Sequence, residues 1–212
     1  MRDLGCLRTV DGRETAWGAV ARGDTPDNLT PAGWDALVAH GVRTIVDLRN
    51  DDERTTEVAR PAEIATVHVP LDGVEDTEFW SEWGTGPQFG TPLYYRPHLE
   101  RFPERNARAI AAVAKAGPGG VLIHCVRGKD RAGQISMLLL ALAGVAPEEI
   151  AADYGLSGDD QAEFLASRGI SSTEVILSTL AEVDVEAYLL ASGLDASELA
   201  AVRARMLRSS TS

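Results

Sequence analysis

Short apolar runs recur along the N-terminal part of the chain, separated by segments whose apolar residues follow a helical period. Apolar runs without polar alternation are typical of strands buried on both faces of a parallel sheet. They predict strands over 42–48, 66–71 and 121–124. The turn-forming pair Asp11-Gly12 predicts a hairpin between two further short strands, 6–9 and 16–20.

Helix signals account for most of the remaining chain. Thr30 can cap a helix that starts at Pro31 and ends at Gly41. Further helices are predicted over 98–116, 134–143, 147–155, 160–167, 173–181, 183–191 and 195–208, and the almost wholly apolar segment 134–143 should be the buried central one. Strands alternating with helices predict an α/β fold, with a short, mainly parallel sheet flanked by helices and a helical C-terminal half. Residues 1–208 are expected to form a single domain, and 209–212 a disordered tail.

The segment 72–97 follows neither period and is rich in glycine and proline. It holds six of the twelve aromatic residues of the chain: Phe79, Trp80, Trp83, Phe89, Tyr94 and Tyr95. Long loops in compact domains are usually functional or disordered, and aromatic content argues against disorder. Two interpretations stay open: a lid over a substrate, formed by 73–97, or a satellite core.

The composition of the chain excludes several classes of function. With 20 Lys+Arg against 32 Asp+Glu the net charge is −12, which argues against binding to nucleic acid or anionic membranes. Cys6 and Cys125 are too few for a disulfide framework, and Cys6 is interpreted as a structural thiol. The apolar run 137–146 is too short to span a bilayer, and the charged N-terminal segment does not resemble a secretory signal. A cytoplasmic protein without stable membrane insertion is expected, while export without a signal peptide and the oligomeric state stay open.

The most informative segment is HCVRGKDRAG, residues 124–133, which joins a predicted buried strand to a predicted helix. Backbone N–H groups converge in such a turn, and Gly128 lets it curl around a tetrahedral anion. Val126, Arg127, Gly128 and Lys129 would line the phosphate site, and Arg131 could hold two phosphate oxygens. The surrounding donors and cations favour the thiolate of Cys125, which is placed for in-line attack on phosphorus. The segment therefore predicts phosphate monoester hydrolysis through a cysteinyl-phosphate intermediate, without metal or cofactor.

The pattern His-Cys-x-x-Gly-x-x-Arg resembles that of the cysteine-dependent protein tyrosine and dual-specificity phosphatase superfamily. Within it, the loop is similar to the bacterial atypical branch, in which it has the form HCxxGKDRTG. RDLG at 2–5, VDLR at 46–49 with Glu53, and DYGLS at 153–157 extend the resemblance. It implies a phosphorylated protein (phosphotyrosine) or phosphoinositide substrate and a supporting role for His124. Asp47, Arg49 and Glu53 are interpreted as an ion-pair network behind the loop.

Protonation of the leaving group requires a general acid. Asp130 lies within the loop, and the GKDR pattern of the resembling branch implies that it takes part. Asp72 and Asp76 follow the third predicted strand, where many members of the superfamily carry their acid. Asp130 is the first candidate and Asp72 the second. His40, His68 and His98 lack metal-ligand spacing and are interpreted as structural.

Two loop positions bear on turnover and substrate. Ala132 stands where the family usually has Ser or Thr, whose hydroxyl helps the thiolate to leave. The alternative function is therefore a catalytically weak, phosphate-binding pseudophosphatase or scaffold. Lys129 is one of only two lysines, and with Arg127 and Arg131 it places three cations around one pocket. The resemblance associates this lysine with phosphoinositide-capable members.

Overall fold

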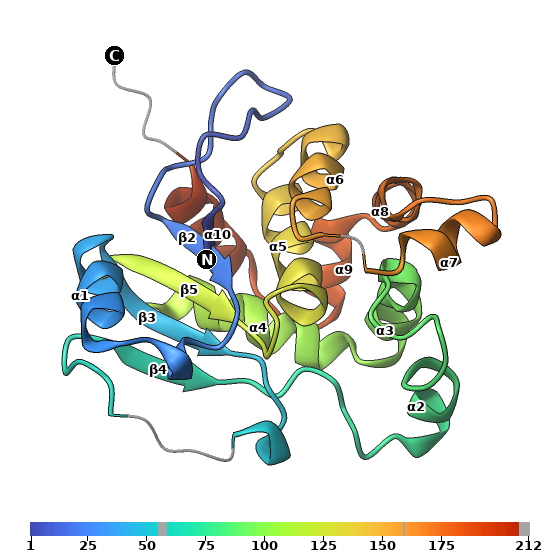
Figure 1. Ribbon diagram of the computed structural model, residues 1–212. Helices are drawn as coiled ribbons and strands as arrows, with labels where there is room; N and C mark the ends of the chain where they lie inside the picture. Colours follow the sequence, from blue (N-terminus) through green and yellow to red (C-terminus); the bar gives the residue numbers. More distant parts are fainter. Residues whose placement is uncertain (55–58, 159, 208–212) are drawn as a thin grey trace.

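The computed structural model describes residues 1–54, 59–158 and 160–207, so the predicted tail 209–212 lies outside the described residues. A five-stranded sheet of order β1-β2-β5-β3-β4 forms the centre of the fold (Figure 1). The strands are β1 (Arg2–Asp3), β2 (Val20–Gly23), β3 (Val42–Asp47), β4 (Ala65–His68) and β5 (Gly120–His124). Strands β2, β5, β3 and β4 are parallel, and β1 pairs antiparallel with β2. The predicted α/β fold with a mainly parallel sheet is confirmed.

Helices cover both faces of the sheet because residues in the central strands point alternately to each side. The helix α1 (Pro31–Ala39) packs on one face, where Ile45 and Leu122 join Trp34 in a small core cluster. Val46 and Ile123 point to the other face and join the main core with the buried helix α5 (Asp130–Leu142). That layer also contains α4 (Pro103–Lys115), α6 (Pro147–Gly155), α9 (Val185–Ala191) and α10 (Ala196–Met206), as Figure 1 shows.

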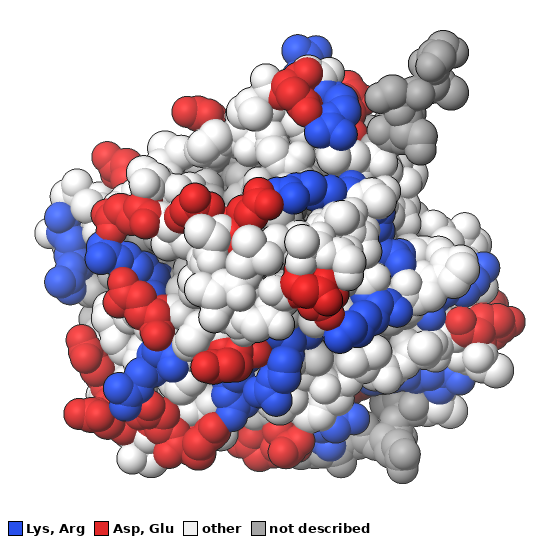
Figure 2. All heavy atoms as spheres, turned by 180° about the vertical axis from the view of Figure 1, so that it is seen from behind, with Lys and Arg blue, Asp and Glu red and all other residues white. Residues whose placement is uncertain are grey.

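Three other helices lie on the side of this layer that is farther from the sheet (Figure 1): α2 (Thr77–Trp83), α3 (Tyr95–Arg101) and α8 (Ser172–Glu182). The short helix α7 (Ala162–Ser167) follows α6. No helix in the described part of the chain has the length and apolar character needed to cross a membrane. On the face opposite to that of Figure 1, acidic and basic side chains are interspersed (Figure 2).

The predicted strands 6–9 and 16–20 are wrong. The turn at Asp11-Gly12 forms, with Gly12 at a φ of 84°, and backbone hydrogen bonds join residues 6–9 to residues 13–15, but the pairing amounts to the isolated bridge between Arg8 and Glu14 and to no strand. Cys6 has a φ of 64°, a left-handed conformation that a continuous strand does not accommodate. The edge of β2 is instead paired by residues 2–3, in the register Arg2↔Arg22.

Three predicted boundaries also differ. The segment 98–116 is two helices, because the chain breaks at Phe102 and Pro103 starts α4. The segment 72–97 is not irregular throughout: Asp76 accepts a hydrogen bond from the Phe79 amide and caps α2. The helix that follows residues 124–129 starts at Asp130 rather than at residue 134.

Candidate active site

The loop predicted to carry the chemistry connects β5, which ends at His124, to α5, which begins at Asp130. Cys125 follows β5 directly and is 3% exposed. Gly128 has a φ of 67°, and a Cβ atom added there would lie 2.3 Å from the carbonyl carbon of Gly23. The end of β2 thus packs against the loop backbone, and only glycine fits at 128.

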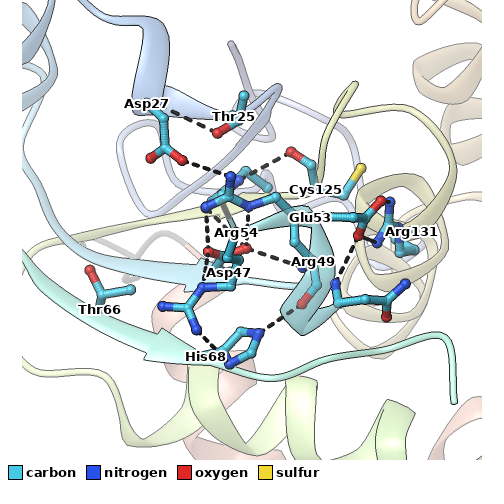
Figure 3. Close-up of polar contacts among 12 residues, drawn as sticks. Thr25, Asp27, Asp47, Arg49, Glu53, Arg54, Thr66, His68, Cys125 and Arg131 are labelled. Carbon is cyan, nitrogen blue, oxygen red and sulfur yellow. Dashed lines mark hydrogen bonds and ion pairs between the residues drawn. The ribbon is translucent and has the colours of Figure 1, made fainter. Parts of the chain in front are cut away.

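Two carboxylates hold the guanidinium of Arg131. Glu53 forms a bidentate pair with it, in which Arg131 Nη2 lies 2.7 Å from Oε1, and Asp72 Oδ2 lies 3.2 Å from Nη1 (Figure 3 draws the pair with Glu53). Burial works against the charged form of Glu53, but the hydrogen bonds from Arg131 hold its pKa below the ordinary value. Glu53 lies in the turn after β3 and Asp72 lies after β4. The carboxyl ends of three strands therefore meet at Arg131.

Both candidate general acids lie beside Arg131, in different environments. Burial raises the pKa of Asp130, against the opposing effect of Lys129 and Arg131. Burial likewise raises the pKa of Asp72, against the effect of Arg131 and of a 2.8 Å hydrogen bond from Asn50 Nδ2. Asp130 Oδ1 is buried and has no hydrogen-bond partner among the described residues. Asp72 is thus held by its neighbours, whereas one oxygen of Asp130 is not. Asp76 caps α2 and pairs with Arg101.

Behind the loop lies the ion-pair network of Asp47 and Arg49. Asp47 is fully buried and accepts hydrogen bonds from Arg49 Nε (3.0 Å) and Nη2 (2.8 Å), while Arg49 Nη1 lies 2.6 Å from Asp27 Oδ2 (Figure 3). His124 Nε2 is 3.5 Å from Asp47 Oδ1, and burial lowers the pKa of His124. His124 Nδ1 is 3.1 Å from the Cys125 carbonyl oxygen. The histidine therefore connects the network to the backbone of the cysteine.

The motifs at 2–5 and 153–157, distant in the sequence, meet in the structure. Arg2 Nη2 lies 2.9 Å from Asp153 Oδ2, and Arg22 Nη1 lies 3.5 Å from the same oxygen. Arg22 also donates a hydrogen bond to Ser157. Since Arg22 lies in β2 next to β5, this network attaches α6 to the strand that supports the loop.

The cations of the loop differ in their surroundings. Arg127 is mostly exposed and pairs at 2.6 Å with Asp160. Lys129 is 6% exposed and makes no ion pair with another described residue. Ala132 is fully buried at the start of α5.

Two adjacent pockets open at the loop. The first, here named the loop pocket, has a volume of about 290 Å³ and is lined by Cys125, Val126, Arg127, Lys129, Asp130, Arg131, Glu53, Phe89, Gly90, Asp160 and Gln161. The second, named the flanking pocket, has a volume of about 330 Å³ and is lined by Asn50, Glu53, Asp72, Val74, Trp80, Gly84, Phe89, Gly90, Tyr94, Asp130 and Arg131. Of the candidate acids, only Asp130 lines both pockets. In the described part of the chain, no group of three or more His, Cys, Asp or Glu residues is arranged to hold a metal ion.

The aromatic segment contributes both to the core and to the pockets. Phe79, Tyr94 and Tyr95 are buried, and the Tyr95 hydroxyl donates a 2.7 Å hydrogen bond to the Asp130 carbonyl at the start of α5. Trp80 and the exposed Phe89 line the flanking pocket. A core role holds for part of the segment, and a lid over substrate stays a proposal for the rest.

The sequence did not single out Asn50 or Asp160, and it named Trp80 only as one of six aromatic residues of a possible lid or satellite core; all three contribute to the site. Asn50 orients Asp72 and the Trp80 indole donates to the Asp72 carbonyl oxygen (2.9 Å), while Asp160 neutralises Arg127. Asn50 follows a predicted strand that ends beside the loop, which is a usable signal. The other two come from segments whose path across the site is set by tertiary packing.

Comparison with known proteins identifies the family. The model of the tyrosine phosphatase family matches residues 1–208, and the chain belongs to this family. A "Tyrosine-protein phosphatase" from Nostoc commune is 34% identical over 157 residues, which are 72% of this chain and 53% of that protein. A protein from Cupriavidus necator named "Putative tyrosine-protein phosphatase" is 30% identical over 194 residues, 86% of this chain and 70% of its own length. The chain thus spans about half of the Nostoc relative.

Among solved structures, the chain is similar to TpbA of P. aeruginosa, including a cysteine-to-serine variant in complex with pTyr. The TM-score to that complex is 0.46 at 18% identity, with 83% of this chain and 86% of the other covered. The resemblance to tyrosine phosphatases drawn from the loop motif is confirmed by the family match.

Proposed function

We propose that the protein hydrolyses phosphotyrosine in protein substrates through a cysteinyl-phosphate intermediate, with residues 1–208 acting as one phosphatase domain. The observation that carries the proposal is the loop pocket, in which Cys125, Arg131 and Asp130 face one cavity at the N-terminal end of α5. Loop amides and Arg131 would bind the phosphoryl oxygens, and Cys125 would attack phosphorus in line. Family membership and the two curated relatives support phosphatase chemistry.

In the first step the Cys125 sulfur forms a bond to phosphorus while the bond from phosphorus to the tyrosine oxygen breaks. We assign the proton donor for that oxygen to Asp130. Its raised pKa keeps the acid form present at higher pH, and its free Oδ1 is not committed to a neighbour. Water then hydrolyses the cysteinyl phosphate and releases inorganic phosphate. Neutral His124 and the buried Asp47 would position the loop rather than react.

Replacement of the nucleophile tests the central step. Cys125→Ser should abolish steady-state turnover of a phosphotyrosine peptide and retain phosphate binding, because a hydroxyl does not ionise near neutral pH while the amide cradle remains. Turnover and calorimetric phosphate affinity are measured in EDTA. Measurable turnover by the variant would contradict the covalent mechanism.

The two candidate acids can be distinguished by their pH profiles. A general acid must be protonated, so kcat/KM should fall as the pH rises through its raised pKa. Asp130→Asn should remove this alkaline limb and lower kcat on a phosphotyrosine peptide about a hundredfold or more, with a smaller loss on p-nitrophenyl phosphate, whose leaving group needs no proton. Asp72→Asn should preserve the limb. If the limb disappears in Asp72→Asn instead, Asp72 is the acid.

The alternative function, a weak phosphate-binding pseudophosphatase, is favoured by the buried Ala132. No side-chain hydroxyl at 132 is available to stabilise the departing thiolate. Ala132→Thr should raise turnover several-fold and reduce the product burst seen in the parent protein, as expected if breakdown of the intermediate is limiting. Stopped-flow product release measures both. An unchanged rate without a burst would remove the main support for the pseudophosphatase.

Phosphoinositide hydrolysis is a second candidate, favoured by the position of Lys129 in the loop pocket beside Arg127 and Arg131. A cation beyond those that hold the reactive phosphoryl group gains most from additional phosphates. At low salt, Lys129→Ala should lower kcat/KM on a phosphoinositide about fivefold more than on a phosphotyrosine peptide, and salt should reduce the difference. Lys129→Met controls for lost packing. Equal losses on both substrates would assign Lys129 to the loop and leave the phosphoinositide hypothesis unsupported.

A further inference from the structure

The flanking pocket is not lined by Cys125, yet it adjoins the loop pocket. The two pockets share five lining residues: Glu53, Phe89, Gly90, Asp130 and Arg131. A substrate whose phosphoryl group lies in the loop pocket therefore presents its neighbouring atoms to the flanking pocket.

The two pockets differ in the balance between positively and negatively charged lining residues. The loop pocket has three cations (Arg127, Lys129, Arg131) against the carboxylates of Glu53 and Asp160. The flanking pocket has Arg131 as its one cationic lining residue against the carboxylates of Glu53 and Asp72. Asp130 lines both pockets, and as the proposed proton donor it is uncharged. A second anionic group would be repelled from the flanking pocket, and a cation would be attracted to it.

The hydrogen-bonding groups of the flanking pocket are mainly acceptors. Asn50 is 8% exposed, and its Oδ1 has no hydrogen-bond partner among the described residues. Asp130 Oδ1 is also buried and has no hydrogen-bond partner among the described residues. Buried acceptors without a donor cost free energy, and a small rotation of either side chain would let it accept a hydrogen bond from an N–H group of a ligand.

Aromatic rings form the apolar side of the pocket. Trp80, Phe89 and Tyr94 line it, and the Trp80 indole N–H is already committed to the Asp72 carbonyl oxygen. Aromatic faces bind cationic heads, and the alkyl stem of a lysine or arginine packs well on such surfaces. A volume of about 330 Å³ accommodates one long side chain.

We propose that the flanking pocket is a subsite for a basic side chain, arginine or lysine, that lies close to the phosphotyrosine in the protein substrate. The proposal rests on the proposed function and adds its substrate class. It assigns Trp80 and Phe89 to the binding of the basic side chain and the carboxylates to its charge. A lipid headgroup with several phosphates would place like charges in this pocket.

Matched peptides test the subsite. Two sets of phosphotyrosine peptides carry either arginine or its neutral isostere citrulline at one position within two residues of the phosphotyrosine. Affinity is measured with the Cys125→Ser protein, which requires no turnover, and kcat/KM with the parent protein. At one or more positions, arginine should improve both quantities about fivefold at low salt, and high salt should reduce the gain.

A substitution at the rim of the flanking pocket tests whether the preference for arginine over citrulline arises there. Val74 lines the flanking pocket and is 53% exposed, so it can be replaced without disturbing the core. Val74→Lys should remove most of the preference for arginine over citrulline, whereas Val74→Gln should preserve it. The ratio of the two peptides is the readout, so any general loss of activity cancels.

The outcomes separate the two proposals. Equal affinity for arginine and citrulline at every position, or a preference that Val74→Lys leaves unchanged, would overturn the subsite. Absence of Cys125-dependent turnover on any peptide would instead overturn the proposed function, and the affinity ratio would still decide the subsite.

Discussion

The contact between Arg131 and Glu53 determines where the other groups of the site lie. A guanidinium buried at this depth needs carboxylate partners, because an unpaired buried charge costs several kcal/mol, of order 3–5 when a partner is removed. Glu53 and Asp72 supply those partners from the ends of β3 and β4. The parallel register places Asp47 opposite both His124 and His68, so that these strands end at one edge of the sheet. The order of the parallel strands therefore brings the residues of the site together.

The sequence motifs share one structural property in this arrangement. Each contains one member of an ion pair whose partner lies in another motif or in the loop. The motif with Glu53 reaches the loop at Arg131, and Arg2 reaches Asp153 in α6. In a chain of net charge −12, Arg127 and Arg131 are each paired with particular carboxylates, whereas Lys129 makes no ion pair with another described residue. Such pairs fix geometry more than they add stability.

The parts of the site that local sequence could predict are those built from one continuous segment. The loop, its buried strand and the candidate nucleophile follow from residues 121–133, because the geometry of a turn between a strand and a helix is a local property. The hairpin of 6–9 with 16–20 was wrong because pairing at the sheet edge is decided by which segment reaches β2. Asp160 was missed for a similar reason: only packing brings its segment across the loop. The choice between lid and core for 73–97 has no single answer, since Tyr95 is buried and Phe89 is exposed.

Gly128 and Gly23 meet backbone to backbone, without a side chain between them. Steric exclusion of this kind is insensitive to proton concentration, whereas the carboxylate partners of Arg131 lose their charge in acid. The curvature of the loop and the placement of its arginine are therefore supported by physically separate means. Acid would release the guanidinium while the backbone of the loop keeps its shape, so that the curvature of the loop and the orientation of its arginine are separable properties of one short segment.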